Sequence, residues 1–176
     1  EYFAEQLDWT IAKQNPGEWR RVVPSPAPHY VMHGKSIKSL VDRGTMVLAA
    51  GGGGIPVYND KNNKLEGLDA VIDKDLTAAM LGRVIRAREL WIITDIDYVY
   101  LRFKKADQKA ISNMTMDEAE KFLKQGEFGK GNMAPKIKAA LYFLAHHGKK
   151  VVITSIPSIE QAINGQAGTV IMKTED

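Results

Sequence analysis

Short apolar runs rich in β-branched residues alternate along this chain with segments of helical period, and this alternation limits the possible folds most strongly. The expected strands are Arg20–Val23, Met46–Ala50, Leu90–Thr94, Lys150–Thr154 and Thr169–Met172. The expected helices are Gly34–Arg43, Lys74–Arg86, Met116–Gln125, Pro135–His147 and Pro157–Asn164. Repeated strand–helix–strand order predicts an α/β fold, a three-layer αβα sandwich whose mainly parallel sheet is covered on both faces. Ligands then bind at the carboxyl ends of the strands.

Local signals support several of these boundaries. Thr115 and Glu118 have the spacing of a capping box, and Gly126 and Gly148 follow two of the expected helices as stop signals. The polar stretch Asn59–Lys64 (NDKNNK) predicts the tip of a hairpin.

Length, composition and charge limit which classes of protein this chain can belong to. The 176 residues fit one domain, 1–176, and no run approaches the roughly 20 apolar residues of a membrane span, so we expect no membrane partner. The chain has no cysteine, which fits a reducing compartment, and we expect a cytoplasmic protein. A net charge of +3 suits anionic substrates but is too small to indicate nucleic acid.

The chain starts at Glu1 rather than methionine, so we expect a piece of something longer.

Two expected helices carry lysines in their first turns, where the backbone dipole is already positive. Asp73 can cap the helix that begins at Lys74, and Pro135 can start the helix that continues with Lys136 and Lys138. Each such lysine costs about 0.3–1 kcal/mol against the helix dipole. Free amides together with a lysine form a site for phosphate or another polyanion. The alternative is that these lysines are simply solvated.

Four glycines, Gly51, Gly52, Gly53 and Gly54, directly follow the apolar run Met46–Ala50. They allow a tight turn that presents bare amides to a ligand. The pattern is neither the dinucleotide GxGxxG nor a P-loop, since no lysine and hydroxyl pair follows. A flexible turn is the alternative interpretation.

Polar residues also close the expected strand Leu90–Thr94. Thr94, Asp95 and Asp97 lie where α/β folds bind ligands, and their oxygens can hold a ribose hydroxyl, an adenine amine or a water of hydrated Mg²⁺. A turn capped by its own Asp side chains is the alternative.

The ordered motifs give a more specific indication. GGGGIP, VIDKD, TDIDYVY and MAPK follow one another, preceded by WRRVVPSPAP at Trp19–Pro28. In order and spacing they resemble the carbamate kinases of the amino-acid kinase superfamily, and the likeness covers nearly the whole chain. It corresponds to the C-terminal half or so of a full-length member. Lys74 before Asp75 resembles carbamate kinases more than the acetylglutamate or aspartate kinases.

The resemblance implies a role for each matching residue. Asp75 would organise the catalytic lysines, Lys74 would contact the transferring phosphoryl group, and Lys136 would bind the terminal phosphate. Gly51–Gly54 would cradle the carbamate end. The residues that would bind the nucleotide are Thr94, Asp95, Asp97, Tyr100, Met133 and Pro135.

The implied reaction moves a phosphoryl group between carbamoyl phosphate and ADP, or between ATP and carbamate in reverse, with Mg²⁺. The resemblance also implies a cytoplasmic homodimer in arginine catabolism, the arginine deiminase pathway. Departures are Ala134 where the family usually has glycine, Pro16-Gly17-Glu18 before Trp19, and no counterpart of the family's phosphate-gripping glycine loop. Two alternatives therefore stay open: an inert truncated remnant that still binds nucleotide or a partner, and another small-molecule kinase of the superfamily.

Other groupings give weaker indications. Arg102, Lys104, Lys105 and Lys109 form a basic stretch beside aromatic residues, but Asp107 interrupts it, so we expect a solvated loop and no nucleic-acid partner. The histidine pairs lack a third ligand or point apart, and we expect no metal bound by side chains of this chain.

Overall fold

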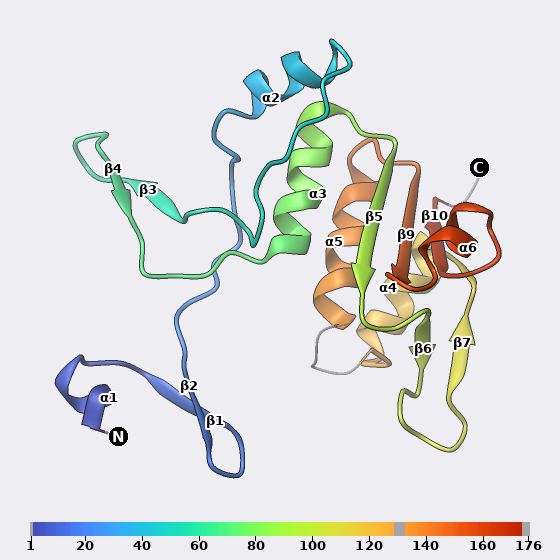
Figure 1. Cartoon of the computed structure of the whole chain (residues 1–176), viewed down its shortest axis with the longest axis horizontal. Coiled ribbons are helices and arrows are strands. Elements are labelled where there is room, and N and C mark those ends of the chain that lie inside the picture. Colours follow the sequence, from blue (N-terminus) through green and yellow to red (C-terminus); the bar gives the residue numbers. More distant parts are fainter. Residues whose placement is uncertain (1, 129–132, 174–176) are drawn as a thin grey trace.

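The structure, a computed structural model, describes residues 2–128 and 133–173. Its centre is a four-stranded sheet of order β5-β9-β10-β8, in which β5 and β9 are parallel, β10 and β8 are parallel, and β9 and β10 are antiparallel. The strands are β5 (Glu89–Thr94), β8 (Asn113–Thr115), β9 (Lys150–Ser155) and β10 (Thr169–Met172). The prediction of an α/β fold with a mainly parallel sheet is confirmed (Figure 1).

One face of the sheet carries the main core. The covering helices are α3 (Lys74–Ile85), α4 (Met116–Lys124) and α5 (Met133–Ala145). Phe143 of α5 is fully buried, and a Cβ at Gly148 would lie 2.4 Å from its ring, while one at Gly82 would lie 2.8 Å away. Both glycines therefore admit the ring, and this lets α3 and α5 pack closely on each other.

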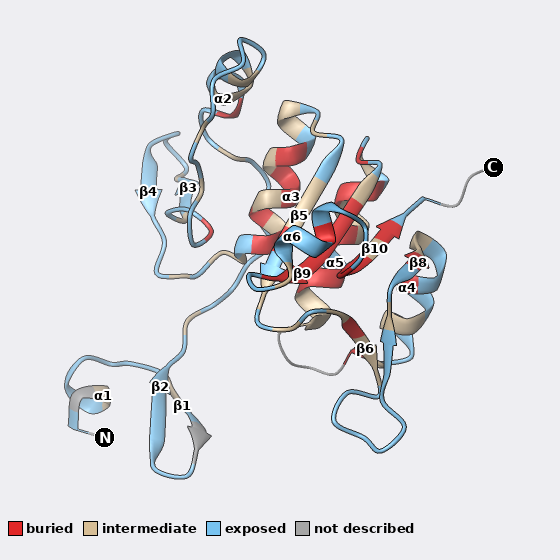
Figure 2. Ribbon diagram, turned by 45° about the vertical axis from the view of Figure 1, so that its right-hand side comes forward, coloured by how far each residue is buried: buried red, intermediate tan, exposed pale blue. Residues whose placement is uncertain are grey.

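The other face of the sheet has a thin cover. Val152 of β9 packs with Ala162 of α6 (Ile159–Ile163) and with Ala167, and Trp91 and Tyr98 border this small cluster. Helices thus lie on both faces, but the buried positions gather mainly beneath α3 and α5 (Figure 2).

The remaining elements project from this body (Figure 1). They are α1 (Tyr2–Gln6), α2 (Gly34–Val41), and the hairpins β1 (Ile11–Asn15) with β2 (Glu18–Arg21), β3 (Val57–Asn59) with β4 (Leu65–Gly67), and β6 (Val99–Leu101) with β7 (Lys109–Ile111). Helix α2 packs on α3, where Gly34 approaches Val84.

Most predicted elements exist, and two strand predictions need correction. The strand expected at Arg20–Val23 is β2, which ends at Arg21 and belongs to a separate hairpin. The strand expected at Met46–Ala50 is wrong, because this run forms no strand and leaves Met46 92% and Leu48 97% exposed. A strand needs a paired neighbour, and no other described segment pairs with this one.

The predicted capping box and the predicted hairpin tip are both present. Thr115 and Glu118 form the capping box, and the Asp60 carboxylate accepts hydrogen bonds from the Asn62 and Lys64 amides in the hairpin tip. After α5 the left-handed residue is His147, with φ 78°, and not Gly148. Gly148 is instead required by its contact with the Phe143 ring.

In the part of the chain that the structure describes, no helix has both the length and the apolar character needed to cross a membrane.

The contact between Gly148 and Phe143 gives a test of this packing. Gly148→Ala should lower the free energy of unfolding by about 1–3 kcal/mol, because the added methyl group overlaps a ring that cannot move within a close-packed core. Urea unfolding followed by circular dichroism measures the change. Gly67→Ala is the matched control, since a Cβ there meets nothing within 4 Å. Equal effects of the two substitutions would contradict the steric explanation.

Candidate active site

The first functional element is the amino end of α3. The Asp73 side chain caps this helix by accepting a 2.8 Å hydrogen bond from the Leu76 amide, as predicted. Lys74 and Asp75 therefore occupy the first turn, with the Lys74 side chain 58% exposed and that of Asp75 10% exposed.

The second element is the amino end of α5, which carries Lys136. This helix begins at Met133, two residues before the predicted start, and accommodates Pro135 because first-turn amides have no partner within the helix. Lys136 is buried, with its side chain 7% exposed.

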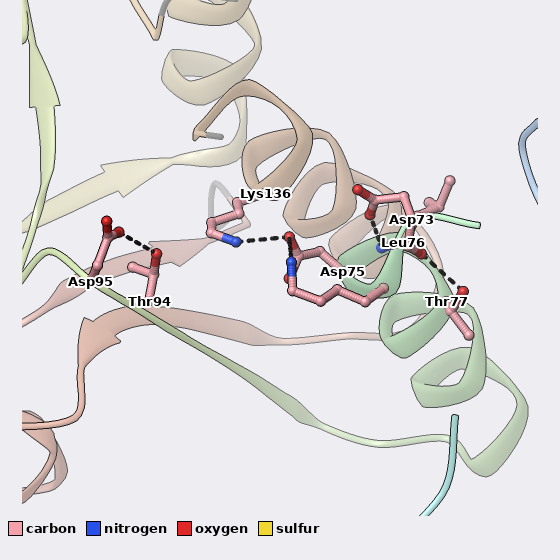
Figure 3. Close-up of polar contacts among 8 residues, drawn as sticks. Asp73, Asp75, Leu76, Thr77, Thr94, Asp95 and Lys136 are labelled. Carbon is pink, nitrogen blue, oxygen red and sulfur yellow. Dashed lines mark hydrogen bonds and ion pairs between the residues drawn. The ribbon is translucent and has the colours of Figure 1, made fainter. Parts of the chain in front are cut away.

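The packing of α3 on α5 brings these two helix ends together (Figure 3). The Lys136 Nζ atom donates to the Asp75 Oδ2 atom at 2.9 Å, and the Lys74 Nζ atom lies 3.7 Å from the same oxygen. One carboxylate thus lies between two ammonium groups, so the cluster keeps a net positive charge beside two helix amino ends. Such an arrangement attracts a phosphate or another anion.

The glycine-rich loop is attached to the same end of α3. Gly53 has φ 129°, and a Cβ on it would lie 2.1 Å from the Ile72 carbonyl oxygen, so no side chain fits there. The Thr77 hydroxyl lies 3.1 Å from the Gly53 carbonyl oxygen and 2.9 Å from that of Asp73, to which it donates. At Gly51, Gly52 and Gly54 a Cβ would meet nothing within 4 Å, so this part of the loop faces open space.

A cavity of about 570 Å³ opens beside Lys136. Its lining residues are Thr94, Asp95, Ile96, Tyr100, Arg102, Phe103, Lys104, Lys105, Gln125, Gly126, Glu127, Phe128, Met133 and Lys136. Of the residues predicted to bind nucleotide, Thr94, Asp95, Tyr100 and Met133 line this cavity, whereas Asp97 and Pro135 do not. The Thr94 hydroxyl donates to the Asp95 carboxylate at 3.0 Å, which holds both side chains at the cavity wall.

Sequence reasoning missed the basic and aromatic part of this wall. Arg102, Lys104 and Lys105 lie in an exposed loop, as expected, but they also line the cavity. The rings of Tyr100 and Phe103 lie 5.8 Å apart, and the Lys104 Nζ atom lies 5.6 Å above the Phe103 ring. The signal that could have found them is the aromatic and basic alternation directly after the TDID motif.

Asp97 faces away from this wall. Its carboxylate accepts hydrogen bonds from the Ser155 hydroxyl and, at 2.8 Å, from the Ser158 hydroxyl, and these bonds lower the pKa of Asp97, with Ser155 the larger cause. The next residues are also anchored on the β9–β10 side, because the Val99 amide donates to the Thr169 hydroxyl at 2.8 Å. Asp97 therefore positions the turn that carries Thr94 and Asp95.

Within residues 2–128 and 133–173, no three His, Cys, Asp or Glu side chains are grouped so that they could hold a metal ion.

Comparison with known proteins shows the family of the chain. The profile of the Amino acid kinase family matches residues 2–155. The chain belongs to this family. Among its amino acid kinase relatives, the chain is 44% identical to the carbamate kinase of Thermoplasma acidophilum over 170 residues, and 41% identical to that of Staphylococcus haemolyticus.

Solved structures of amino acid kinases show the same similarity. The structure of carbamate kinase from Giardia lamblia bound to AMP-PNP matches with a TM-score of 0.87 and 35% identity, over 98% of this chain and 54% of the other. The Thermoplasma match covers 97% of this chain and 55% of the relative. The chain therefore spans about half the length of these relatives, and the family resemblance predicted from its motifs is confirmed.

The buried ion pair predicts unequal effects of removing the two lysines. Lys136→Met should lower the free energy of unfolding by about 3–5 kcal/mol, because the Asp75 carboxylate stays buried but loses its nearer lysine. Lys74→Met, the matched control, removes an exposed lysine 3.7 Å from the same carboxylate and should cost less than about 1 kcal/mol. Denaturant titrations at neutral pH compare the two. Similar losses would show that the burial of Lys136 does not matter.

The serine contacts predict how Asp97 titrates. Ser155→Ala should raise the pKa of Asp97 towards its ordinary value of 3.8, and Ser158→Ala should raise it less. Because the folded pKa is lowered, the stabilisation from Asp97 is present above pH 3.8 and is lost as the pH falls through the folded pKa. Carboxyl carbon chemical shifts followed by NMR measure the titration. Ser112→Ala is the control, and an unchanged pKa in the Ser155 variant would refute the assignment.

Proposed function

We propose that this chain supplies the nucleotide-binding and phosphoryl-binding part of a carbamate kinase, which transfers a phosphoryl group between carbamoyl phosphate and ADP. One observation carries the proposal: the buried pair of Lys136 and Asp75 places a fixed cation on the wall of a cavity of about 570 Å³. Relatives named carbamate kinase, one of them bound to AMP-PNP, support this choice of reaction.

The cavity wall has a chemical order that suits a nucleotide. Tyr100 and Phe103 offer ring faces on which an adenine can stack, and Thr94 and Asp95 offer hydrogen-bonding oxygens beside them. Lys136 lies on the same wall, so a nucleotide stacked on the rings would direct its phosphates towards this lysine. Lys104 and Lys105 also line the cavity and add positive charge to its wall.

The chemistry of phosphoryl transfer needs charge compensation more than covalent help. Lys136 is held in one position by Asp75, so it can stabilise charge that develops on the transferring phosphoryl oxygens without first reorganising. Lys74 is exposed and its ammonium group can reach a second oxygen of the same group. Carbamate is already an anionic nucleophile, so no general base is required.

The remaining roles follow from the position of the glycine loop and from the charge of the substrates. The loop Gly51–Gly54 is attached to α3 beside Asp75 and presents backbone groups to open space, and we assign it to the carbamate end of the substrate. Mg²⁺ would neutralise the phosphate charge when it is bound. Asp95 and Glu127 are the carboxylates of the cavity wall that fit such an ion, which commonly takes one or two carboxylates together with the substrate phosphates.

The same proposal includes a physiological setting. Carbamoyl phosphate produced by arginine breakdown would regenerate ATP through this reaction, in a cytoplasmic homodimer. The family relationship supports this setting.

A second candidate function follows from the length of the chain. Because it spans about half of its relatives, the chain can retain the cavity and bind nucleotide or a partner without turnover. Calorimetric binding of Mg-ADP without ATP formation in any form of the protein would favour this candidate.

A coupled assay of ATP formation from carbamoyl phosphate and Mg-ADP tests the proposal, on this chain and on the longest reading frame that contains it. Lys136→Ala should lower kcat by about 10²–10³, the cost of losing one preorganised donor to a developing oxyanion. Lys138→Ala, an exposed lysine on the same helix, is the matched control and should leave kcat unchanged.

Circular dichroism at the assay temperature shows whether the variants are folded, because the loss of Lys136 also destabilises the protein. A kcat of the folded Lys136 variant equal to that of the unmodified protein would refute the assigned role, and inactivity of the longest form would refute carbamate kinase activity itself.

A further inference from the structure

The aromatic and basic part of the cavity wall belongs to the hairpin of β6 and β7 and to the loop between them. Among the described residues these two strands pair only with each other, and the hairpin extends away from the central sheet (Figure 1). A two-stranded hairpin is marginally stable by itself in water, so its orientation must come from contacts with the rest of the protein. The position of the cavity wall therefore depends on how the base of this hairpin is held.

One buried hydroxyl group binds both strands of the hairpin at its base. Val99 of β6 lies opposite Ile111 of β7 in the register of the hairpin. The Thr169 hydroxyl accepts a 2.8 Å hydrogen bond from the Val99 amide and donates to the Ile111 carbonyl oxygen. A threonine hydroxyl has one donor and two acceptor sites, so this single group satisfies a donor on one strand and an acceptor on the other.

The Thr169 hydroxyl is itself held in a fixed place. Thr169 is the first residue of β10 and lies opposite Ile153 of β9 within the central sheet. Thr169 and Val99 are both 0% exposed, so water cannot replace the hydroxyl. A buried amide that loses its partner is costly. The hydrogen bond therefore favours one orientation of the hairpin relative to the sheet.

The loop beyond the hairpin is held by contacts of its own. The Arg102 Nε atom donates to the Asp107 carbonyl oxygen at 3.2 Å and lies 3.1 Å from the Asp107 carboxylate. The Lys104 amide donates to the Gln108 side chain at 2.7 Å. Because these contacts stay within the loop, they fix its shape but not its direction. The direction is set at the base, where Thr169 contacts both strands.

Neighbouring contacts hold the chain just outside the hairpin. Asp97 binds the Ser155 hydroxyl before β6 begins, and the Val170 amide donates to the Ser112 carbonyl oxygen after β7 ends. Each of these contacts fixes one end of the segment. The Thr169 hydroxyl differs from them, because it joins both strands of the hairpin to the central sheet at once.

We propose that Thr169 is a positioning residue for nucleotide recognition, which acts by holding Tyr100 and Phe103 in place on the cavity wall. Thr169 does not line the cavity itself, and Tyr100 directly follows the anchored Val99. The inference rests on the proposed function, because it takes the cavity to be the nucleotide site. Without the hydroxyl, fewer molecules present the rings in the binding orientation, and the apparent affinity falls in proportion.

Turnover at saturating nucleotide should change less than binding. Lys136 is held by Asp75 where α3 packs on α5, and this contact lies outside the hairpin. A residue that acts on binding alone raises KM and leaves kcat unchanged. General destabilisation has a different signature, because it lowers the fraction of folded protein and leaves the KM of the folded molecules unchanged.

Calorimetric titration with Mg-ADP tests the inference on the longest reading frame that contains this chain. Thr169→Val keeps the shape of the side chain without the hydroxyl, and should raise the Kd for Mg-ADP about tenfold by leaving the hairpin in place in about a tenth of the molecules. Thr169→Ser retains the hydroxyl and should keep the Kd within about twofold of the unmodified value.

Thr154→Val is the matched control. Thr154 is also 0% exposed and lies on the adjacent strand β9, but its hydroxyl has no hydrogen-bond partner in the described part of the chain. The control should bind Mg-ADP like the unmodified protein. The coupled assay on the same variants should show a raised KM for ADP in Thr169→Val with an unchanged kcat.

The outcomes separate this inference from the proposed function. If the unmodified protein does not bind Mg-ADP, both fail. If it binds, an unchanged Kd in the folded Thr169→Val variant overturns the inference alone, and so does an equal loss of affinity in Thr154→Val or in Thr169→Ser. If circular dichroism shows that Thr169→Val does not fold, Thr169→Cys replaces it; the weaker thiol donor should raise the Kd about threefold, and an unchanged Kd would overturn the inference.

Discussion

The ion pair between Asp75 and Lys136 is the interaction on which the candidate site depends. Each residue lies in the first turn of its own helix, and each is buried. A lysine at that position opposes the helix dipole, and its burial is tolerable only with a partner at hydrogen-bonding distance. The pair forms where α3 packs on α5, and in this packing Phe143 of α5 lies against Gly82 of α3. Core packing thus determines the position of the charge.

In the turn after β5, some side chains line the cavity and a neighbouring side chain holds the turn in position. Thr94 and Asp95 face the cavity, whereas Asp97 binds the hydroxyls of Ser155 and Ser158. Because a short turn cannot direct every polar side chain to one side, a motif rich in aspartate contains both kinds of residue. Asp97 therefore holds the wall in place, and Thr94 and Asp95 form part of the wall.

The exposed run Met46–Ala50 and the outer edge of β5 both lack a neighbouring strand in the part of the chain that the structure describes. The run Met46–Ala50 has the composition of a buried strand, and β5 is the outermost strand of the described sheet. The chain spans about half the length of its relatives. The glycine loop that follows this run is nevertheless attached to α3, because the Thr77 hydroxyl lies within hydrogen-bond distance of the Gly53 carbonyl oxygen.

The sequence by itself determined the α/β class, the helices α3, α4 and α5, the capping box at Thr115, the family, and the unusual placement of Lys136, since each depends on short-range periodicity, spacing or ordered motifs. Only the tertiary structure decided which further residues share the cavity with Thr94, Asp95, Tyr100 and Met133. It brought the basic loop that begins at Arg102 to the wall, turned Asp97 away from it, and gave Met46–Ala50 no paired strand among the described residues. Those outcomes depend on contacts between segments far apart in the chain, and local patterns carry no information about such distances.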